Sequence, residues 1–423
     1  MFHSTINKTP HVDFITAMQA GLAADGGLFV PDYFPSIALE QFPTSLSYSQ
    51  FASQLLRYFI DEPLQAELDL LCQQAFNFDI PLKQLNPNTW VLELFHGPTL
   101  SFKDFGARFI AACLQRVPTE KPITILVATS GDTGSAVAAA FYQKHPIRVI
   151  VLYPKGKISL RQQQQITCWQ DNILAVEVEG DFDDCQRLVK AAFSDPWWQA
   201  HTQLTTANSI NIARLLPQMV YYAYTSVHFQ AAHSVAPGFV VPSGNLGNVT
   251  AAYWAKILGF PIRDIAIATN ANRPLTDYLA TGEYHALPTQ MTLANAMDVG
   301  NPSNFARLQN LFPNFAEFKA NVQATRVEDP QIKETIKQVY QHEHYLLCPH
   351  TATAYVARTH LNDQPWIITA TAHPCKFENV IQDAIGIDVA PTAELTALLD
   401  RPHDHVTIHA DLDALSNVAA AHV

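Results

Sequence analysis

Short apolar segments that run through glycine loops into helix-forming segments constrain the fold of this chain more than any other feature. The clearest examples are ITILVATS at residues 123–130, which leads through GDTG into SAVAAAFYQK, and GFVVPSGNLGN at residues 238–248, which leads into VTAAYWAKILG. Similar apolar segments lie at residues 147–154, 172–180, 264–270 and 366–372. Because strands covered by helices on both faces are apolar throughout, this alternation predicts an α/β protein with mostly parallel sheets.

The length of the chain and the change of pattern along it predict more than one domain. A chain of 423 residues is longer than one core usually accommodates. We expect a mainly helical amino-terminal segment over residues 1–87, a smaller α/β domain over residues 88–205 and a larger α/β domain over residues 206–423. The cleft between the two α/β domains is the expected site of function.

Composition excludes several classes of partner. The net charge is −12 and there is no basic block, so binding to nucleic acid through phosphate neutralisation is disfavoured. The amino terminus, MFHSTINKTPHVDF, lacks the pattern of a secretory signal, and no apolar run is long enough to span a bilayer. The six cysteines form no C-x-x-C pair, which predicts free thiols in a reducing compartment. We expect a cytoplasmic enzyme.

Two glycine loops, SGDTGS at residues 130–135 and SGNLGN at residues 243–248, are candidate anion sites. Each follows an expected strand and opens an expected helix, where free amides and the helix dipole attract an anion. Neither matches G-x-G-x-x-G or a P-loop. They are either ordinary β–α turns or a pair of sites for a cofactor phosphate and a substrate carboxylate. Asp132 is unusual in an anion site and could accept a hydrogen bond from a phenol or an ammonium group.

Lys103 lies between aromatic residues in LFHGPTLSFKDFG, residues 94–106. It could rest its stem on Phe102 and Phe105 with its ammonium group in water. Beside two anion sites it could instead be a reactive amine that the two phenyl rings keep dry, with Asp104 turned toward hydrogen bonds at the helix start. Thr371 follows the strand at 366–372, at the edge where ligands bind in α/β sheets. Its hydroxyl could face a ring nitrogen or bond to the backbone.

Two histidine-rich segments do not have the spacing of known metal sites. QHEHYLLCPH, which contains His342, His344, Cys348 and His350, is not H-E-x-x-H and has no second ligand group. In RPHDHVTIHADL, His403, His405 and His409 alternate on what we expect to be a solvent-facing strand. We therefore predict no metal site. The absence of G-x-S-x-G disfavours a serine hydrolase.

Taken together, these segments identify a family resemblance. ELFHGPTLSFKDFG, ATSGDTGSAV, LYPKGKIS, ANSINIARLLPQ, VPSGNLGN, NAMDVGNPSN and ATAHPCKF occur in this order and closely resemble the threonine synthases. These are pyridoxal-phosphate enzymes of the tryptophan-synthase-β fold group, or PLP fold type II. The resemblance extends from GLAADGGLFVP to about residue 390. Departures at Ile6, Asn7, Leu160, Thr205 and Thr206 bear on affinity for the substrate phosphate.

The resemblance implies roles for individual residues. Lys103 would form the internal Schiff base with pyridoxal 5'-phosphate, Thr371 would face the pyridine nitrogen, and Asp132 would lie near the phenolic oxygen. The cofactor phosphate would be cradled by Gly244, Asn245, Leu246, Gly247 and Asn248. The substrate carboxylate would be held by Ser130, Gly131 and Thr133. The substrate-phosphate side would be lined by Lys157, Ser159, Asn208, Ser209, Asn211 and Arg214.

The implied reaction converts O-phospho-L-homoserine and water to L-threonine and phosphate by β,γ-elimination and replacement, the last step of threonine biosynthesis. Lys103 would be the base for the proton transfers at Cα and Cβ. A threonine or serine dehydratase-like lyase and a catalytically silent binder of the cofactor or a phospho-ligand remain alternatives. The resemblance favours a monomer and leaves a dimer open.

Overall fold

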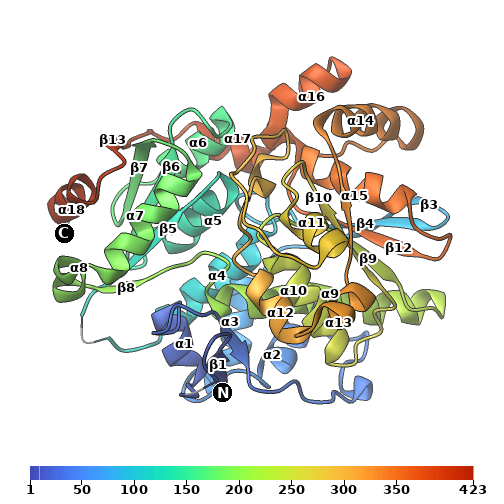
Figure 1. The fold of residues 1–423 in the computed structure, drawn as a ribbon, viewed down its shortest axis with the longest axis horizontal. Coiled ribbons are helices and arrows are strands. Elements are labelled where there is room, and N and C mark those ends of the chain that lie inside the picture. Colours follow the sequence, from blue (N-terminus) through green and yellow to red (C-terminus); the bar gives the residue numbers. More distant parts are fainter. Residues whose placement is uncertain (9, 120, 423) are drawn as a thin grey trace.

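The computed structural model describes residues 1–8, 10–119 and 121–422, and two mostly parallel sheets organise it. Figure 1 shows the five-stranded sheet on the left and the six-stranded sheet on the right. The six-stranded sheet has the order β11-β10-β9-β12-β4-β3, with strands Gln323–Arg326, Ile265–Thr269, Gly238–Pro242, Trp366–Ala370, Thr89–Glu93 and Leu82–Asn86. The five-stranded sheet has the order β13-β7-β6-β5-β8, with strands Val406–His409, Ile173–Glu179, Arg148–Pro154, Ile123–Ala128 and Gln203–Thr205. Only the β3–β4 pair in these two sheets is antiparallel.

Both faces of the larger sheet are buried under helices, which explains why its central strands are apolar throughout. Phe239 and Val241 of β9 belong to the main core, together with residues of α9 (Ile212–His233) and α10 (Gly247–Ile257). Val240, between them, points to the opposite face and packs with Ala354 and Ala357 of α15 (Pro349–Thr359). Alternate residues of one strand therefore serve two cores. Further helices on this side are α11 (Pro274–Thr281), α12 (Phe305–Leu311), α13 (Phe315–Asn321), α14 (Asp329–Glu343) and α16 (Glu378–Ile385).

The smaller sheet follows the same rule. Ile125 and Val127 of β5 belong to the main core with residues of α4 (Lys103–Leu114) and α5 (Asp132–Phe141). Leu126 faces the other way, into a separate cluster with residues of α7 (Phe182–Ser194) and α18 (Leu412–Ala421). The remaining helices of this side are α6 (Leu160–Thr167), α8 (Pro196–His201) and α17 (Ala393–Leu399). The prediction of mostly parallel sheets between helices is confirmed.

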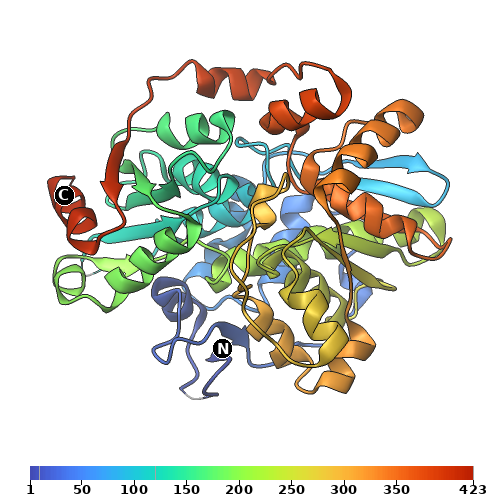
Figure 2. The same cartoon turned by 45° about the horizontal axis from the view of Figure 1, so that its top comes forward.

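Strand pairing crosses the domain boundaries expected at residues 87/88 and 205/206, which stay a prediction. The strand β3 lies in the expected helical segment and β4 just after it, yet both belong to the six-stranded sheet. The strand β13, near the carboxyl terminus, pairs in parallel with β7 of the other sheet. Figure 2 shows the terminal segment crossing the top of the molecule between the two sheets.

The amino-terminal segment consists of short helices and a small sheet. Its helices are α1 (Phe14–Ala20), α2 (Tyr48–Leu56) and α3 (Leu68–Ala75). The strands β1 (Phe2–Ser4) and β2 (Phe29–Pro31) form a two-stranded antiparallel sheet. None of the helices in the described ranges has the length and apolar character needed to cross a membrane.

Two smaller sequence predictions can be compared with the structure. All six cysteines are buried free thiols, as expected. His403, His405 and His409 are exposed, also as expected. However, β13 begins at Val406, so only His409 lies on the strand. The two earlier histidines precede the strand, where Asp404 bonds through its amide to the carbonyl of Thr167.

Candidate active site

One cavity lies between the loops that follow β5, β9 and β12. The first of these strands belongs to the five-stranded sheet and the other two belong to the six-stranded sheet. Strand carboxyl ends and helix amino termini converge there, which makes this edge the usual ligand site of α/β sheets. The cavity lining includes most of the residues expected from the sequence, namely Lys103, Ser130, Asp132, Thr133, Asn208, Ser209, Arg214, Gly244, Asn245, Leu246, Gly247, Asn248 and Thr371.

The loop between β9 and α10 is shaped to hold an anion. Leu246 takes the left-handed conformation, φ 61°, just before the helix begins at Gly247. Among the bonds between described residues, the backbone amides of Gly244 through Asn248 donate none. A Cβ on Gly244 would lie 2.5 Å from Met297 Cα, so only glycine fits there. Free amides at a helix amino terminus are the usual cradle for a phosphate.

Side chains on both sides of this loop hold it in place. Asn245 accepts a hydrogen bond from the amide of Ser303 at 2.6 Å and donates one to Ser209 Oγ at 2.8 Å. Asn304 donates to the carbonyl of Asn245 at 3.0 Å. These bonds use side-chain atoms and the carbonyl of Asn245, so they leave the loop amides available.

Asn248 presents an unpartnered donor to the cavity. Tyr221 and Tyr222 both donate their hydroxyl protons to Asn248 Oδ1, Tyr222 at 2.8 Å. This orientation leaves Asn248 Nδ2 buried without a partner among the described residues, and the same holds for Arg214 Nε. A buried donor without a partner costs about 1–3 kcal/mol. Anionic groups would supply the missing acceptors, and the Asn248 donor, next to the free amides of residues 244–248, fits the phosphate of pyridoxal phosphate.

Lys103 begins α4 and points its amine into the cavity. Its Nζ lies 3.8 Å from Asp132 Oδ2 and 5.0 Å from the centre of the Phe102 ring. Burial lowers the pKa of Lys103, the charge of Asp132 opposes this, and Lys376 and Arg214 lower it further. The amine therefore loses its proton more readily than an exposed lysine does.

Of the residues around Lys103, Phe102 faces the cavity, whereas Asp104 and Phe105 do not. Asp104 faces away from the cavity and accepts hydrogen bonds from the amide and hydroxyl of Thr99 at 2.9 and 2.7 Å, as expected for the helix start. Phe102 lines the cavity. The expectation that Phe105 also shields the amine is wrong. Its ring packs in the core against Phe78 and Tyr221, because residues two apart on a helix face different sides.

Asp132 is paired with Lys376, a lysine in ATAHPCKF for which the sequence predicts no role. Lys376 Nζ lies 2.7 Å from Asp132 Oδ1 and donates to the carbonyl of Thr99 at 2.8 Å, and its side chain is fully buried. Burial alone raises the pKa of Asp132, but Lys376, Lys103 and His350 lower it more, so the pKa lies below its ordinary value. Asp132 is an ionised acceptor between two lysines.

His350 is the second residue that the sequence analysis missed. It lies in a segment judged only by metal-ligand spacing, yet its ring lines the cavity. Its Nε2 accepts a hydrogen bond from the amide of Ala296 at 3.1 Å, so that nitrogen carries no proton. Burial lowers the pKa of His350 to about 4. The ring is neutral at physiological pH.

The loop before α5 offers a second set of free amides. Thr129 Oγ1 accepts from the amides of Gly131 at 3.0 Å and Gly134 at 2.8 Å. The amides of Ser130, Asp132 and Thr133 donate to none of the described residues. The turn therefore exposes three donors at the helix amino terminus, an arrangement suited to a carboxylate.

Arg214, Asn208 and Ser209 also line the cavity. Arg214 donates from Nη1 to the carbonyl of Ala207, and burial lowers its pKa to about 10. Asn208 donates to the carbonyl of Ala128 at 2.8 Å. Ser209 Oγ accepts from Asn245 and from Asn304, so its own proton is free for a ligand.

Four expected site residues lie outside the cavity lining. Gly131, φ 129°, approaches Gln162 so closely that a Cβ would lie 2.5 Å from its amide. Lys157 is exposed. Ser159 caps α6 and donates to the carbonyl of Lys376 at 3.1 Å. Asn211 caps α9 and donates to the carbonyls of Met18 and Thr206, so its polar atoms are fully used.

Thr371 lines the cavity just beyond the end of β12. Its carbonyl accepts from the amide of Phe102 at 2.9 Å, which ties the strand end to the segment before Lys103. Of the two alternatives raised by the sequence, a hydroxyl bonded to the backbone is not found among the described residues.

Family models cover almost the whole chain. The model for pyridoxal-phosphate dependent enzymes matches residues 72–372. The model for the threonine synthase N terminus matches residues 1–76, and the model for the threonine synthase C-terminal region matches residues 349–418.

Relatives that match over most of their length are threonine synthases. The chain is 41% identical to the threonine synthase of Haemophilus influenzae over 381 residues, 89% of each chain. It is 38% identical to that of Escherichia coli over 416 residues, 97% of each.

Solved structures agree with these relatives. The threonine synthase of Escherichia coli superposes with a TM-score of 0.94 at 38% identity and covers 100% of both chains. The pyridoxal phosphate-bound threonine synthase of Brucella melitensis superposes with a TM-score of 0.91 at 34% identity, covering 100% of this chain and 99% of that one. A tomato threonine deaminase, at 14% identity and a TM-score of 0.56, shares the fold alone. The chain belongs to the threonine synthase family of pyridoxal-phosphate-dependent enzymes.

Proposed function

We propose that this chain converts O-phospho-L-homoserine and water to L-threonine and phosphate. The observation that carries the proposal is the position of Lys103, a largely buried amine of lowered pKa that lines one cavity together with two helix amino termini whose amides are free. The substrate has two anionic ends, a carboxylate and a phosphate, and the cofactor brings a second phosphate. The site therefore needs separate binding groups for three anions, with a reactive amine among them.

The residues that would hold the cofactor surround this amine. Lys103 would attach the cofactor, and the amides of residues 244–248 with Asn248 Nδ2 would bind its phosphate. Thr371 would present a neutral hydroxyl to the ring nitrogen. Asp132 would lie near the phenolic oxygen, and Lys376 would keep the Asp132 carboxylate ionised. When bound, the cofactor delocalises the negative charge that develops on the substrate carbons.

Lys103 would also move the protons. With the substrate bound, its free amine would remove protons at Cα and at Cβ, and phosphate would leave from Cγ. The two protons would then return to Cγ and Cα, while water would supply the hydroxyl group at Cβ and its remaining proton would go to the released phosphate. A lowered pKa keeps more of this amine unprotonated at neutral pH. Phe102, whose ring centre lies 5.0 Å from the amine, and Met297 both line the cavity and would limit access of bulk water.

The two ends of the substrate would bind on opposite sides of Lys103. The free amides of Ser130 and Thr133 would hold the carboxylate. Arg214 would supply positive charge for the substrate phosphate, with the free proton of Ser209 and the amide of Asn208 beside it. Gly131, Lys157, Ser159 and Asn211 would act at most indirectly, since they do not line the cavity.

We also propose that the chain acts as a monomer in the cytoplasm. Six buried free thiols suit a reducing compartment. Light scattering after gel filtration measures the oligomeric state, and a dimer at micromolar protein concentration would overturn the monomer.

The function is tested by following absorption, phosphate and threonine together after O-phospho-L-homoserine is added to the purified holoenzyme. We expect equal amounts of phosphate and threonine from the wild type and none from Lys103→Ala. Lys155→Ala, an exposed lysine, is the matched control and should retain full activity. A cofactor band without phosphate release would overturn the proposed reaction, and conversion of added L-threonine to a 2-oxo acid would assign a dehydratase instead. Absence of a cofactor band after reconstitution would overturn the cofactor site.

A further inference from the structure

Two histidines and an aspartate, His3, His11 and Asp32, lie together on one face of the amino-terminal sheet, and none of them lines the cavity. Phe2 pairs with Pro31 across β1 and β2, and an isolated bridge joins Phe2 to Val12. His3 is therefore directly opposite His11, and Asp32 follows β2 on the same face. Backbone bonds fix this register, with Phe2 and Val12 exchanging two bonds of 2.8 and 2.9 Å. The amide of Asp32 also donates to the carbonyl of Met1 at 3.1 Å.

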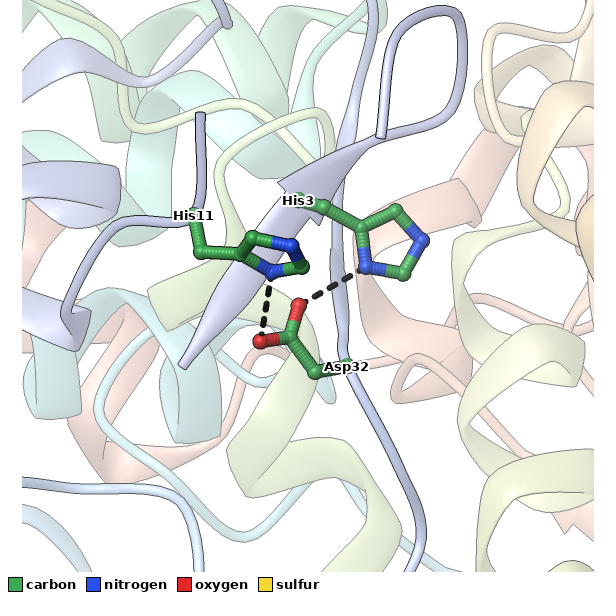
Figure 3. Close-up of side chains that lie close together, drawn as sticks. All are labelled: His3, His11 and Asp32. Carbon is green, nitrogen blue, oxygen red and sulfur yellow. Dashed lines mark hydrogen bonds and ion pairs between the residues drawn. The ribbon is translucent and has the colours of Figure 1, made fainter. Parts of the chain in front are cut away.

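The three side chains converge on one point, as Figure 3 shows. His3 Nδ1 lies 2.8 Å from Asp32 Oδ1, and His11 Nδ1 lies 2.8 Å from Asp32 Oδ2. One ligand atom from each residue lies within 4.8 Å of the others. Side-chain exposures of 11% for His3, 20% for Asp32 and 48% for His11 leave an open side toward solvent.

We propose that His3, His11 and Asp32 bind a divalent first-row transition-metal ion such as Zn²⁺. Two imidazole nitrogens and one carboxylate oxygen are a ligand set that suits Zn²⁺, and water from the open side completes the coordination. Without the ion, both Nδ1 atoms must carry a proton to donate to the carboxylate. With the ion, each neutral ring carries its proton on Nε2 instead, and each Nδ1 lone pair bonds the metal. A ring that was protonated releases one proton.

Other histidine–carboxylate contacts in the chain lack this convergence. His145 meets Asp171 at 2.9 Å, and His409 meets Glu179 at 2.7 Å, each as one ring on one carboxylate. In the described part of the chain, only His3, His11 and Asp32 form a group of three suitable ligand residues. His145 therefore provides a matched control, since it has the same pairing without a third ligand.

The bound ion would stabilise the fold rather than take part in the reaction. Arg307 donates to the carbonyl of Phe29 on β2 at 3.0 Å, and to the carbonyls of Ser209 and Ile210 at 2.9 and 2.7 Å. The small sheet is thereby attached to the segment that carries Ser209. Cross-linking three segments of this sheet should raise the melting temperature of the protein without changing turnover.

The test uses the holoenzyme after treatment with a chelator, titrated with Zn²⁺ by calorimetry and with Co²⁺ by visible absorption. We expect one equivalent to bind the wild type and to raise its melting temperature. His11→Gln and Asp32→Asn should weaken binding at least about tenfold, since losing even an outer partner of a ligand costs that much. His145→Gln should bind like the wild type.

His11→Gln is the main variant because its exposed side chain makes misfolding unimportant. Its turnover should equal that of the wild type, because the cofactor site is unchanged. Weaker metal binding in this variant therefore shows that the measured ion does not bind at the cofactor. Unchanged affinity in His11→Gln, an equal loss in His145→Gln, or no binding by the wild type would each overturn the proposal.

Discussion

Lys376 and Asp132 form a buried ion pair that joins the two halves of the molecule, with Nζ 2.7 Å from Oδ1. Lys376 follows β12 of the six-stranded sheet, and Asp132 begins α5 after β5 of the five-stranded sheet. The other oxygen of the same carboxylate lies 3.8 Å from Lys103 Nζ. One carboxylate is thus shared by two lysines, and the charge of one lysine affects the pKa of the other.

Replacing Lys376 by methionine should alter both stability and the pH dependence of activity. The change leaves Asp132 buried without its main partner, which should cost about 3–5 kcal/mol of unfolding free energy. The positive charge of Lys376 lowers the pKa of Lys103, so its loss should raise that pKa and move the acid limb of kcat/KM to higher pH. Urea unfolding and a pH–rate profile measure the two effects.

Lys155→Met is the matched control for this experiment, because Lys155 pairs with Glu179 at 3.0 Å on the surface. Exposed pairs contribute little to stability because water and salt screen them, so this variant should behave like the wild type. An unchanged pH profile in Lys376→Met would show that the lysine does not tune Lys103.

Gly244→Ala should weaken cofactor binding. The added methyl would lie 2.5 Å from Met297 Cα, so the backbone of the loop or of Met297 must move. Movement of the loop displaces the free amides, and we expect at least roughly a tenfold rise in the cofactor dissociation constant. Titration of the apoenzyme with pyridoxal phosphate, followed by absorption, measures this constant.

Gly386→Ala is the control that separates damage to the phosphate-binding loop at residues 244–248 from a general loss of stability. Gly386 has φ 71°, and a Cβ there meets nothing within 4 Å. Its substitution should cost about 1–2 kcal/mol of backbone strain and leave cofactor affinity unchanged. Equal affinities in all three proteins would contradict the role of Gly244.

His350 should make the protein less stable as the pH falls. Burial lowers the pKa of its ring from 6.5 to about 4. Between these pH values the unfolded chain binds a proton that the folded chain does not, so the contribution is complete above pH 6.5 and is lost as the pH falls toward 4. The loss is on the order of 3 kcal/mol. His350→Gln should keep an acceptor for the amide of Ala296 and flatten this dependence.

Urea unfolding at several pH values between 4 and 8 compares His350→Gln with wild type and with the exposed control His285→Gln. His373, whose pKa burial also lowers to about 4, leaves part of the dependence in every variant. Parallel stability curves for wild type and His350→Gln would rule out the protonation of His350 as a cause.

Arg214→Ala should mainly weaken binding of the phosphorylated substrate. Arg214 lines the cavity, and its Nε has no partner among the described residues. Loss of a buried, charge-assisted contact should raise KM at least about tenfold, with a smaller effect on kcat. Arg187→Ala, at an exposed arginine, serves as the control for general loss of charge. An unchanged KM would place the substrate phosphate elsewhere.

Local patterns along the chain determined the class of fold and the centre of the site. Strands such as ITILVA and GFVVP must be apolar on both faces because helices cover both, and this shows in single segments. The loop at residues 243–248 and Lys103 could also be identified from short segments, the loop from its place between a strand and a helix and Lys103 from the motif around it. A glycine loop between a strand and a helix carries its free amides within one short stretch of chain, whatever the rest of the molecule does.

Only the tertiary structure decided which distant residues meet and which faces are buried. Lys376 and His350 reach Asp132 from more than 200 positions away, and no local pattern pairs them. Asn211 and Ser159 turned out to be helix caps because capping and ligand binding use the same polar side chains. The addition of β4 to one sheet and β13 to the other, and the meeting of His3, His11 and Asp32, follow from strand register. Register depends on burying whole faces together, which is a property of the assembled fold and not of any one segment.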